Sequence, residues 1–520
     1  MSRQMINTCF SLVKWNTRDP HNVVQGALHR IAVDTQQLTQ LQDPSNGIRN
    51  HPEIRKYMHY AADKLASEMA ERIKRHGARQ VPLTKAGALW VIEKLRGTQP
   101  KAKIHKLRQM VDQIPWNELQ HTGLKFVKKT GTQVFIKNEF YPVGNKAPRL
   151  ICFPQEGEKL IMTMAFFHIL HPFFSSRYAT KEIPEHRRPY VIEERLKYTE
   201  RKFVADYTSF ECCANRDIMR HGEHRVLKRL VAPEYHFVFP WIEAGGRLTH
   251  RSGVTIRTSA IQFSGRYTTS LSNSIRNKLF MDVVALDNGL RIDDYVGVYE
   301  GDDSLTGWPR RITKDRIERS LAKIGVAAEI DEYENVGEAG YCSTYWNANM
   351  ELVYEPIKAL ARFPFTSSQL AACKANYAPL LSAKAMSMAY RAPGCPIIAA
   401  VVRRYISSTG YMETRNEWER RWFLQFAHTR EINRHSRVLN VCFDRWDLVR
   451  EPTPTQRAFF EKIFGISVPN QIAAERHILE DDGFNPVLLA CLEDGQQKAG
   501  VNLDELRCIY ETMRSHARSF

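Results

Sequence analysis

The stretch YVGVYEGDDSL, at residues 295–305, predicts two short β-strands joined by an acidic turn. Gly301 gives the turn access to backbone angles that other residues avoid, and Asp302 and Asp303 follow it directly. Paired aspartates also occur at 293–294 and 481–482, and such a pair is most often a solvated turn or a helix cap. The acidic turn alone therefore does not indicate a functional site, and the surrounding sequence has to be considered with it.

Two stretches upstream supply that context. DYTSFE, at residues 206–211, follows an apolar strand-like run, so its first carboxylate is expected at the end of a strand. SGRYTTSLSN, at residues 264–273, leads into a predicted helix over residues 268–286. Another helix, over residues 312–325 and closed by glycine, is predicted after the acidic turn. Strand and helix signals thus alternate around the three motifs.

Carboxylates on a tight hairpin and at the end of a neighbouring strand would form a hard, oxygen-rich site. Mg²⁺ and Mn²⁺ prefer such ligands, and a pair of these ions promotes in-line phosphoryl transfer by activating a hydroxyl and stabilising the leaving oxygen. The side chains of Ser264, Thr269 and Asn273 are suited to contact a sugar, and Gly265 would let the backbone approach a substrate closely.

The three stretches, in this order, resemble the palm of viral RNA-dependent RNA polymerases, and most closely that of the tombus-like and noda-like positive-strand RNA viruses. The matched residues fall in three of the family's motifs: Asp206 and Glu211 in motif A, Ser264, Gly265, Thr269 and Asn273 in motif B, and Gly301, Asp302 and Asp303 in motif C. Glu211 departs from the aspartate that is usual in the family, which keeps the charge and changes its reach.

Three other motifs of the family have counterparts outside these stretches. FIKNEFY and NKAPRLI resemble motif F, whose basic residues would be Lys137, Lys146 and Arg149. The helix over 312–325 resembles motif D, although the lysine usual after its glycine turn is missing and Lys323 is the nearest candidate general acid. AGYCSTYW, around Cys342, resembles motif E.

The resemblance implies an α+β right-hand fold with fingers, palm and thumb. Residues 1–200 would form an N-terminal extension and the fingers, with part of the palm entering near residue 160. Residues 201–350 would form the palm, an antiparallel sheet with helices, and would carry a fingers insertion within about 212–262. Residues 351–520 would form a helical thumb.

The resemblance also implies a role for each matched side chain. Asp206 and Asp302 would hold two Mg²⁺ or Mn²⁺ ions with help from Asp303, and Lys137, Lys146 and Arg149 would line the channel for the triphosphate and RNA. Asn273 and Glu211 would sense the ribose 2′-hydroxyl, within a site that includes Ser264, Gly265 and Thr269. The implied activity is RNA-directed RNA synthesis from NTPs on a viral RNA template.

Composition agrees with a nucleic-acid partner. The 520 residues include 74 Lys and Arg against 57 Asp and Glu, a net charge of +17, which favours binding to a polyanion. The ten cysteines form no CxxC pair, as expected of free thiols in a reducing compartment. The longest uncharged stretch, residues 160–176, predicts a buried helix ending near Pro172 and not a transmembrane segment.

Three alternatives remain open from the sequence. A reverse transcriptase shares the carboxylates but usually carries a bulky aromatic gate in place of a ribose-sensing pair. A non-catalytic RNA-binding replication scaffold would use the basic charge alone, and a metal-dependent nuclease would have no evident use for the Ser-Gly-Thr-Asn motif. The expected location is the host cytoplasm, at membrane-associated replication complexes, with other viral replication proteins as partners and only indirect contact with host membranes.

Overall fold

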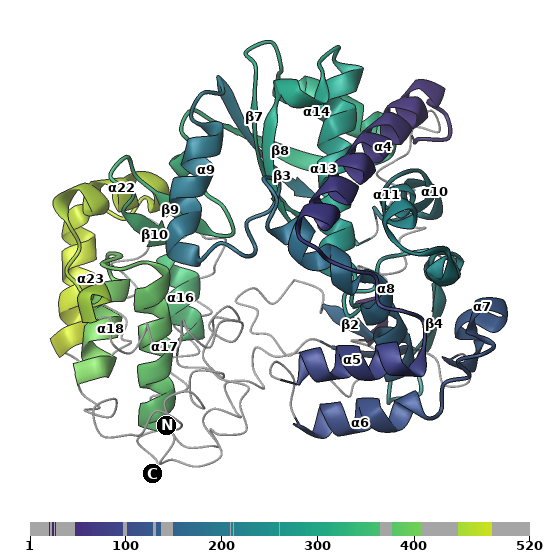
Figure 1. Cartoon of the computed structure of the whole chain (residues 1–520). Coiled ribbons are helices and arrows are strands. Elements are labelled where there is room, and N and C mark those ends of the chain that lie inside the picture. The colour runs from purple at the N-terminus through teal and green to yellow at the C-terminus, as the bar shows by residue number, and fades with distance from the viewer. Residues whose placement is uncertain are drawn as a thin grey trace.

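The computed structural model describes residues 47–96, 101–127, 132–136, 149–207, 210–211, 213–258, 260–363, 377–407 and 446–480, with a few positions between 20 and 27. Helices and three small sheets make up this part of the chain, so the predicted α+β class is confirmed (Figure 1).

The central sheet has four antiparallel strands in the order β6-β7-β3-β8. Their bounds are Arg201–Tyr207 for β3, Val296–Glu300 for β6, Asp303–Trp308 for β7 and Ala328–Tyr333 for β8. The two strands predicted around the acidic turn are thus β6 and β7, and the strand predicted before Asp206 is β3. The sheet forms from three separate parts of the sequence, which converge at the acidic turn.

Side chains alternate across the central sheet, so each face packs against a different core. Phe203, Ala205 and Tyr207 of β3 belong to the larger core, which lies among the helices on one face. Val298 and Leu305, on the other face, pack into a second core with the C-terminal helices. The sheet therefore joins two halves of the molecule.

The first half contains the long helix α13, Thr269–Asp287, which packs against α4, α11 and α14 and confirms the helix predicted over 268–286. The other helices of this half are α4 Pro52–Arg75, α5 Lys85–Leu95, α6 Lys101–Val111, α7 Leu119–Thr122, α8 Glu156–Phe174, α10 Arg216–His221, α11 Glu223–Leu230, α12 Val238–Glu243 and α14 Lys314–Ile324, with 3-10 turns η1 Gly123–Val127, η3 Pro233–Tyr235 and η4 Ile292–Asp294. Helix α14 ends at Gly325, whose φ of +92° is the left-handed geometry that glycine tolerates.

Helix α8 is the buried helix expected from the uncharged stretch, and it continues for two residues past Pro172. Proline at that position removes only one hydrogen bond because the helix ends in the same turn. No described helix combines the length and apolarity needed to cross a membrane.

A second sheet, in the order β2-β1-β4-β5, lies beside these helices. Its strands are β1 Thr132–Ile136, β2 Leu150–Phe153, β4 Gly246–Thr249 and β5 Thr255–Thr258. Only β1 and β4 pair parallel, which joins segments more than 100 residues apart in the sequence. The sheet places β2 directly against the loop that precedes α13.

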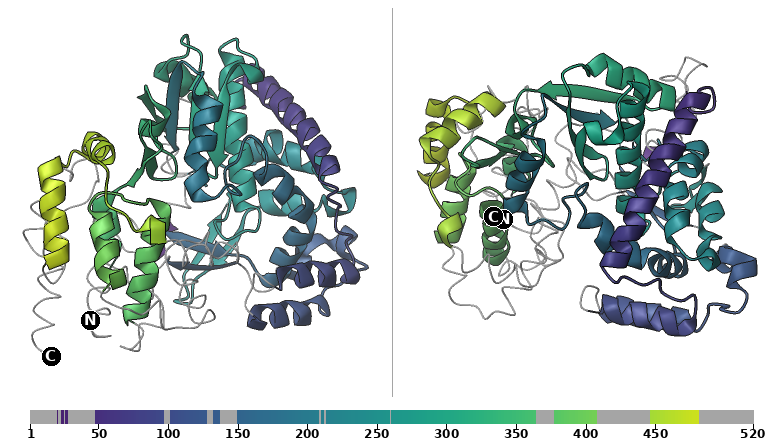
Figure 2. Two further views of the ribbon diagram at one scale, coloured as in Figure 1. Left: turned by 60° about the vertical axis from the view of Figure 1, so that its left-hand side comes forward. Right: turned by 45° about the horizontal axis from the view of Figure 1, so that its top comes forward.

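The C-terminal half is mostly helical, as expected, and lies on the opposite side of the central sheet from α5, α6 and α7 (Figures 1 and 2). Its elements are α15 Val336–Ala339, β9 Thr344–Trp346, β10 Leu352–Tyr354, α16 Pro356–Arg362, α17 Tyr377–Arg391, α18 Ile398–Ser407, η7 Trp446–Leu448, α22 Pro454–Phe464 and α23 Val468–Glu480. From earlier in the chain, α9 Arg188–Leu196, which follows the 3-10 turn η2 Glu185–Arg187, packs into the same core. The boundary drawn at residue 350 stays a prediction.

Candidate active site

The acidic turn between β6 and β7 is fixed from behind by helix α13. Gly301, with φ of +73°, donates its amide hydrogen to Ser274 Oγ at 2.8 Å. Asn277, almost one turn further along α13, donates from Nδ2 to the carbonyl of Asp302 at 2.8 Å. These bonds hold the backbone of the turn while leaving the carboxylates of Asp302 and Asp303 exposed.

Strand β3 is tied to the same helix residue. Tyr207 donates its hydroxyl hydrogen to Asn277 Oδ1 at 2.9 Å inside the core. Asn277 is fully buried, so each of its polar groups is committed to a neighbouring strand or turn. Sequence reasoning missed Ser274 and Asn277, although their spacing on one face of a predicted helix after Asn273 was a usable signal.

The strand register brings Asp206 to the acidic turn. In the antiparallel pair of β3 and β7, Val204 lies opposite Leu305. Continuing this register by two residues sets Asp206 opposite Asp303, and opposed residues share one face of a sheet. Both side chains are exposed. The three predicted catalytic aspartates therefore come together at one end of the central sheet.

The electrostatics of the turn are those of carboxylates without a counter-ion. Although solvent reaches Asp303, the protein around its carboxylate raises its pKa to about 6, and the negative charge of Asp302 adds to the effect. Cys342 Sγ donates a weak hydrogen bond to Asp303 Oδ2 at 3.5 Å, and burial keeps the pKa of this thiol well above its ordinary value. Cys342, from the predicted motif E, thus lies beside the turn.

Glu300, the last residue of β6, has a different environment. Its Oε2 accepts a hydrogen bond from Thr180 Oγ1 at 3.1 Å, and Arg188 Nη1 lies 3.6 Å away. The guanidinium offsets this charge, whereas none of the three aspartates forms an ion pair with a described residue. Of these four carboxylates, the three aspartates are therefore the ones without a cationic partner among the described residues.

The donor set can be tested for its fit to a divalent metal ion. Across the described ranges, no three His, Cys, Asp or Glu side chains are already gathered around one point where a metal ion would bind. However, Asp206, Asp302 and Asp303 supply only oxygen donors, are accessible and repel one another, and a hard cation relieves that repulsion. The residues fit Mg²⁺ or Mn²⁺ if side-chain rotation brings the carboxylates together.

This environment predicts a pH dependence. The pKa of Asp303 in the folded protein lies above that of an unfolded aspartate, so its contribution to stability is present at low pH and is lost as the pH rises through about 6. In EDTA, we expect the wild-type protein to lose thermal stability relative to Asp303→Asn between about pH 4 and about pH 6, and Mn²⁺ to reverse that loss. Identical melting profiles for the two proteins would contradict this assignment.

The loop before α13 is held by its own polar side chains. Thr269 donates its hydroxyl hydrogen to the carbonyl of Phe263 at 2.6 Å and accepts one from Gln262 Nε2 at 3.2 Å. Ser264 Oγ lies 3.4 Å from both the carbonyl of Leu150 and the amide nitrogen of Cys152. Both hydroxyl groups, expected at a sugar, therefore have structural partners.

Gly265 was expected to let the backbone approach a substrate, and in the structure it lets the loop approach the backbone of Cys152. A Cβ atom at this position would lie 2.3 Å from the carbonyl oxygen of Cys152, and the Gly265 amide donates to that oxygen at 3.0 Å. The backbone that approaches Gly265 in this structure is strand β2, and its predicted approach to a substrate stays a prediction. Only glycine lets the loop pack against β2 at this distance.

Asn273 is oriented by a buried ion pair. Arg276 Nη1 donates to Asn273 Oδ1 at 3.2 Å, and Arg276 Nε donates to Glu223 Oε1 at 3.1 Å. Both charged side chains are at most 1% exposed. Glu223 and Arg276 are functional candidates that the sequence motifs did not single out, because their pairing joins α11 to α13 across 53 residues of sequence.

A small cavity of about 40 Å³ brings together three more of the predicted residues. Arg149, Glu211 and Ser264 line it, from the start of β2, the end of motif A and the loop before α13. A basic, an acidic and a hydroxyl side chain thus meet at one opening. Lys137 and Lys146 lie outside the described residues.

Comparison with known families agrees with this arrangement. A family model described as viral RNA-directed RNA polymerase matches residues 202–335, which run from β3 to just past β8 and include the acidic turn and α13. Residues 202–335 therefore form the polymerase region of a viral RNA-directed RNA polymerase. Such an enzyme is a nucleotidyltransferase that uses RNA, NTPs and divalent metal ions. No curated protein matches the chain.

Within the polymerase, Lys323 is engaged away from the three aspartates. Its ammonium group donates to both carboxylate oxygens of Asp287, at 2.8 and 2.9 Å. This pair links the end of α14 to the end of α13. Lys323 is therefore placed as a helix-linking residue here, and its candidacy as general acid draws no support from this geometry.

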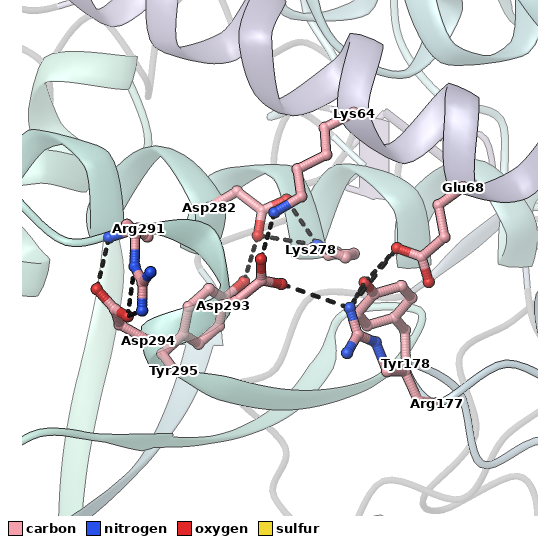
Figure 3. Close-up of polar contacts among 10 residues, drawn as sticks. All are labelled: Lys64, Glu68, Arg177, Tyr178, Lys278, Asp282, Arg291, Asp293, Asp294 and Tyr295. Atoms are coloured by element: carbon pink, nitrogen blue, oxygen red, sulfur yellow. Dashed lines mark hydrogen bonds and ion pairs between the residues drawn. The ribbon is translucent and has the colours of Figure 1, made fainter.

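A buried polar cluster braces strand β6 of the polymerase against α13 (Figure 3). Lys278 and Asp282 form an ion pair at 2.7 Å, and Asp282 accepts a hydrogen bond from the Tyr295 hydroxyl at 2.7 Å. Tyr295 and Tyr299 share a hydrogen bond of 3.0 Å. Tyr299 directly precedes Glu300, so the cluster anchors the strand that leads into the acidic turn.

Helix α4 joins the same region from outside (Figure 3). Tyr178 donates to Glu68 Oε2 at 2.6 Å, and Lys64 pairs with Asp293 at 2.6 Å. The Tyr299 amide donates to the Tyr178 carbonyl at 2.8 Å. An N-terminal helix thereby supports the strand of the acidic turn, over 200 residues further along the chain.

The hydrogen bonds by which Ser274 and Asn277 hold the acidic turn, here called the clamp, can be tested by mutation. Asn277→Ala removes the bonds to Tyr207 and to the Asp302 carbonyl, so we expect a loss of about 1–3 kcal/mol in the free energy of unfolding and a fall in kcat of about tenfold or more with RNA affinity kept. Asn288→Ala, at the far end of α13, removes comparable bonds to Val284 and Ser320 and serves as the control. Equal effects of both changes on kcat would contradict the clamp.

Proposed function

We propose that the polymerase extends an RNA 3′-hydroxyl on a viral RNA template by two-metal nucleotidyl transfer from NTPs. The observation that carries this proposal is the convergence of Asp206, Asp302 and Asp303 at the end of one sheet, without cationic partners among the described residues. Asp206 and Asp302 would hold the two Mg²⁺ or Mn²⁺ ions, and Asp303 would assist. The bound ions would supply Lewis-acid activation of the hydroxyl and stabilisation of the leaving pyrophosphate.

The protein's own residues would keep this site in place during the reaction. Ser274 and Asn277 hold the backbone of the acidic turn, so the carboxylates start from a fixed position. Preorganised ligands avoid the cost of rearrangement at each catalytic cycle. Arg149, at the cavity that it shares with Glu211, is suited to bind phosphate oxygens with its forked guanidinium.

Selection of the sugar would depend on Asn273 and Glu211. Arg276 holds Asn273 Oδ1 at 3.2 Å and so fixes which way the amide points. An amide fixed in this way can form a hydrogen bond with a ribose 2′-hydroxyl. When the substrate lacks that hydroxyl, the amide is left without this hydrogen-bond partner. This is also the feature that separates the proposal from a reverse transcriptase.

We further propose the right-hand layout for the complete chain. The central sheet with α13 and α14 would be the palm, α4–α6 and the second sheet would belong to the N-terminal extension and fingers, and the helices from α16 onward would form the thumb. Two separate cores, one on each face of the central sheet, support a division of this kind. A tombus-like or noda-like origin, and action at membrane-associated complexes in the host cytoplasm with other viral proteins, belong to the same proposal.

The preference for ribose tests the proposal. We expect the wild-type protein to incorporate NTPs on an RNA template far better than dNTPs, and Asn273→Ala to narrow that preference by about tenfold or more. The comparison uses single-nucleotide incorporation with matched NTP and dNTP concentrations, and Asn347→Ala, in the turn after β9, serves as an amide-loss control. A wild-type enzyme that favours dNTPs would establish the reverse-transcriptase alternative instead.

A further inference from the structure

A larger cavity, of about 600 Å³, lies on the side of the molecule that carries α7 and β4 (Figure 1). Its walls come from η1, from helix α12 and from the loop that precedes α13. Ligand sites for small molecules have volumes in this range. The cavity is separate from the acidic turn, since none of the catalytic aspartates lines it.

Aromatic side chains form much of its wall. Phe237, Trp241 and Phe263 all line the cavity, and the Trp241 indole is oriented by donating from Nε1 to Glu158 Oε2 at 3.0 Å. Trp308 and Trp346, in contrast, are at most 2% exposed within the cores. Trp241 is therefore the one of these three tryptophans that a ligand can reach.

The charges around the cavity favour an anion. Lys125 and Arg247 line it, are exposed, and form no ion pair with any described residue. The carboxylate on its wall, Glu158, is already paired with Arg266 at 3.2 Å, and both of these side chains are at most 3% exposed. An entering ligand thus meets an aromatic wall, uncompensated positive charge and no uncompensated carboxylate from the described lining.

We propose that this cavity is a second nucleotide-binding site, distinct from the catalytic one. An aromatic base would pack against Trp241 and Phe237, and the phosphate would be bound at Lys125 and Arg247. Stacking of bases on aromatic side chains beside a basic groove is the common mode of sequence-independent nucleotide binding. The same chemistry serves a free nucleotide and a nucleotide within single-stranded RNA.

The cavity also reaches the loop before α13. Phe263 and Arg266 line it and stand on either side of Ser264 and Gly265, with the Arg266 guanidinium 4.2 Å from the centre of the Phe263 ring. A nucleotide in the cavity would therefore contact Phe263 and Arg266 of the candidate substrate loop.

Binding of AMP and of a fluorescent oligoadenylate to the full-length protein tests the proposal. EDTA is present throughout, so that binding does not depend on catalytic metal ions. We expect Arg247→Ala to weaken binding about fivefold or more and Trp241→Leu about tenfold or more. Arg316→Ala, which removes an exposed charge from α14, should leave binding unchanged. Azido-AMP should cross-link to peptides covering residues 121–127 or 237–247.

The results with the two probes decide whether the cavity binds a nucleotide and whether that nucleotide is free or part of RNA. If AMP binds and both cavity variants weaken it, the ligand is a free nucleotide. If only oligoadenylate binds, and the same variants weaken it, the ligand is a nucleotide of an RNA strand. Because Trp241→Leu also removes the bond to Glu158, Arg247→Ala provides the variant that leaves the described contacts intact. Absence of binding to both probes, or binding unchanged in both variants, would overturn the proposal.

Discussion

Asp302→Asn is expected to reduce RNA synthesis by about a thousandfold or more while the protein stays folded. The change keeps the size of the side chain and removes one charge from an exposed position, so it leaves the bond between Asn277 and the Asp302 carbonyl in place. Loss of a metal-binding carboxylate removes several kcal/mol of transition-state stabilisation, and each 1.36 kcal/mol corresponds to about tenfold in rate.

Single-turnover incorporation on a primed RNA template measures this effect. Asp315→Asn is the matched control, because Asp315 is an exposed aspartate in the first turn of α14 and lies outside the acidic turn. A melting profile within a degree or so of wild type for both variants would separate chemistry from folding. If Asp302→Asn retained activity close to that of the control, the assignment of the acidic turn would fail.

Arg276→Met should have the largest effect on stability. The change removes the only ion-pair partner described for Glu223, whose side chain is 0% exposed. Glu223 Oε2 already lacks a hydrogen bond in the described structure. Breaking a buried ion pair in this way costs about 3–5 kcal/mol in the free energy of unfolding. Denaturant unfolding of the variant, compared with wild type, measures that cost.

The double variant Glu223→Gln/Arg276→Met separates the two roles of this pair. Removing both charges should recover much of the lost stability, because no unpaired charge then remains buried. The bond from Arg276 to Asn273 stays absent, so the preference for NTPs over dNTPs should remain weakened. Full recovery of that preference in the double variant would show that Arg276 does not orient Asn273.

Features with a strong local signal could be predicted from sequence. Strand β3, the β6–β7 hairpin and helices α13 and α14 follow from apolar periodicity, from the glycines at 301 and 325 and from the short distance between partners along the chain. The motif order also placed Asp206 with Asp302 and Asp303, and the register of β3 against β7 agrees with that placement.

Features set by distant partners could not be predicted in the same way. The parallel pair of β1 with β4 joins segments more than 100 residues apart, and no local pattern specifies such a pairing. Gly265 was expected at a substrate, yet the atom that requires it is the Cys152 carbonyl. Lys323 was the nearest candidate general acid, and here its ammonium group donates to Asp287. In each case the contact comes from a distant element that no local pattern indicates.

The central claim is that this chain copies RNA with metal ions held at the acidic turn. Incorporation of NTPs by the purified full-length protein, on RNA templates of different sequence and with Mg²⁺, Mn²⁺ or EDTA, tests it most directly. The account predicts products complementary to each RNA template in either metal and none in EDTA. Synthesis that ignores the template, or that continues unchanged in EDTA, would contradict it.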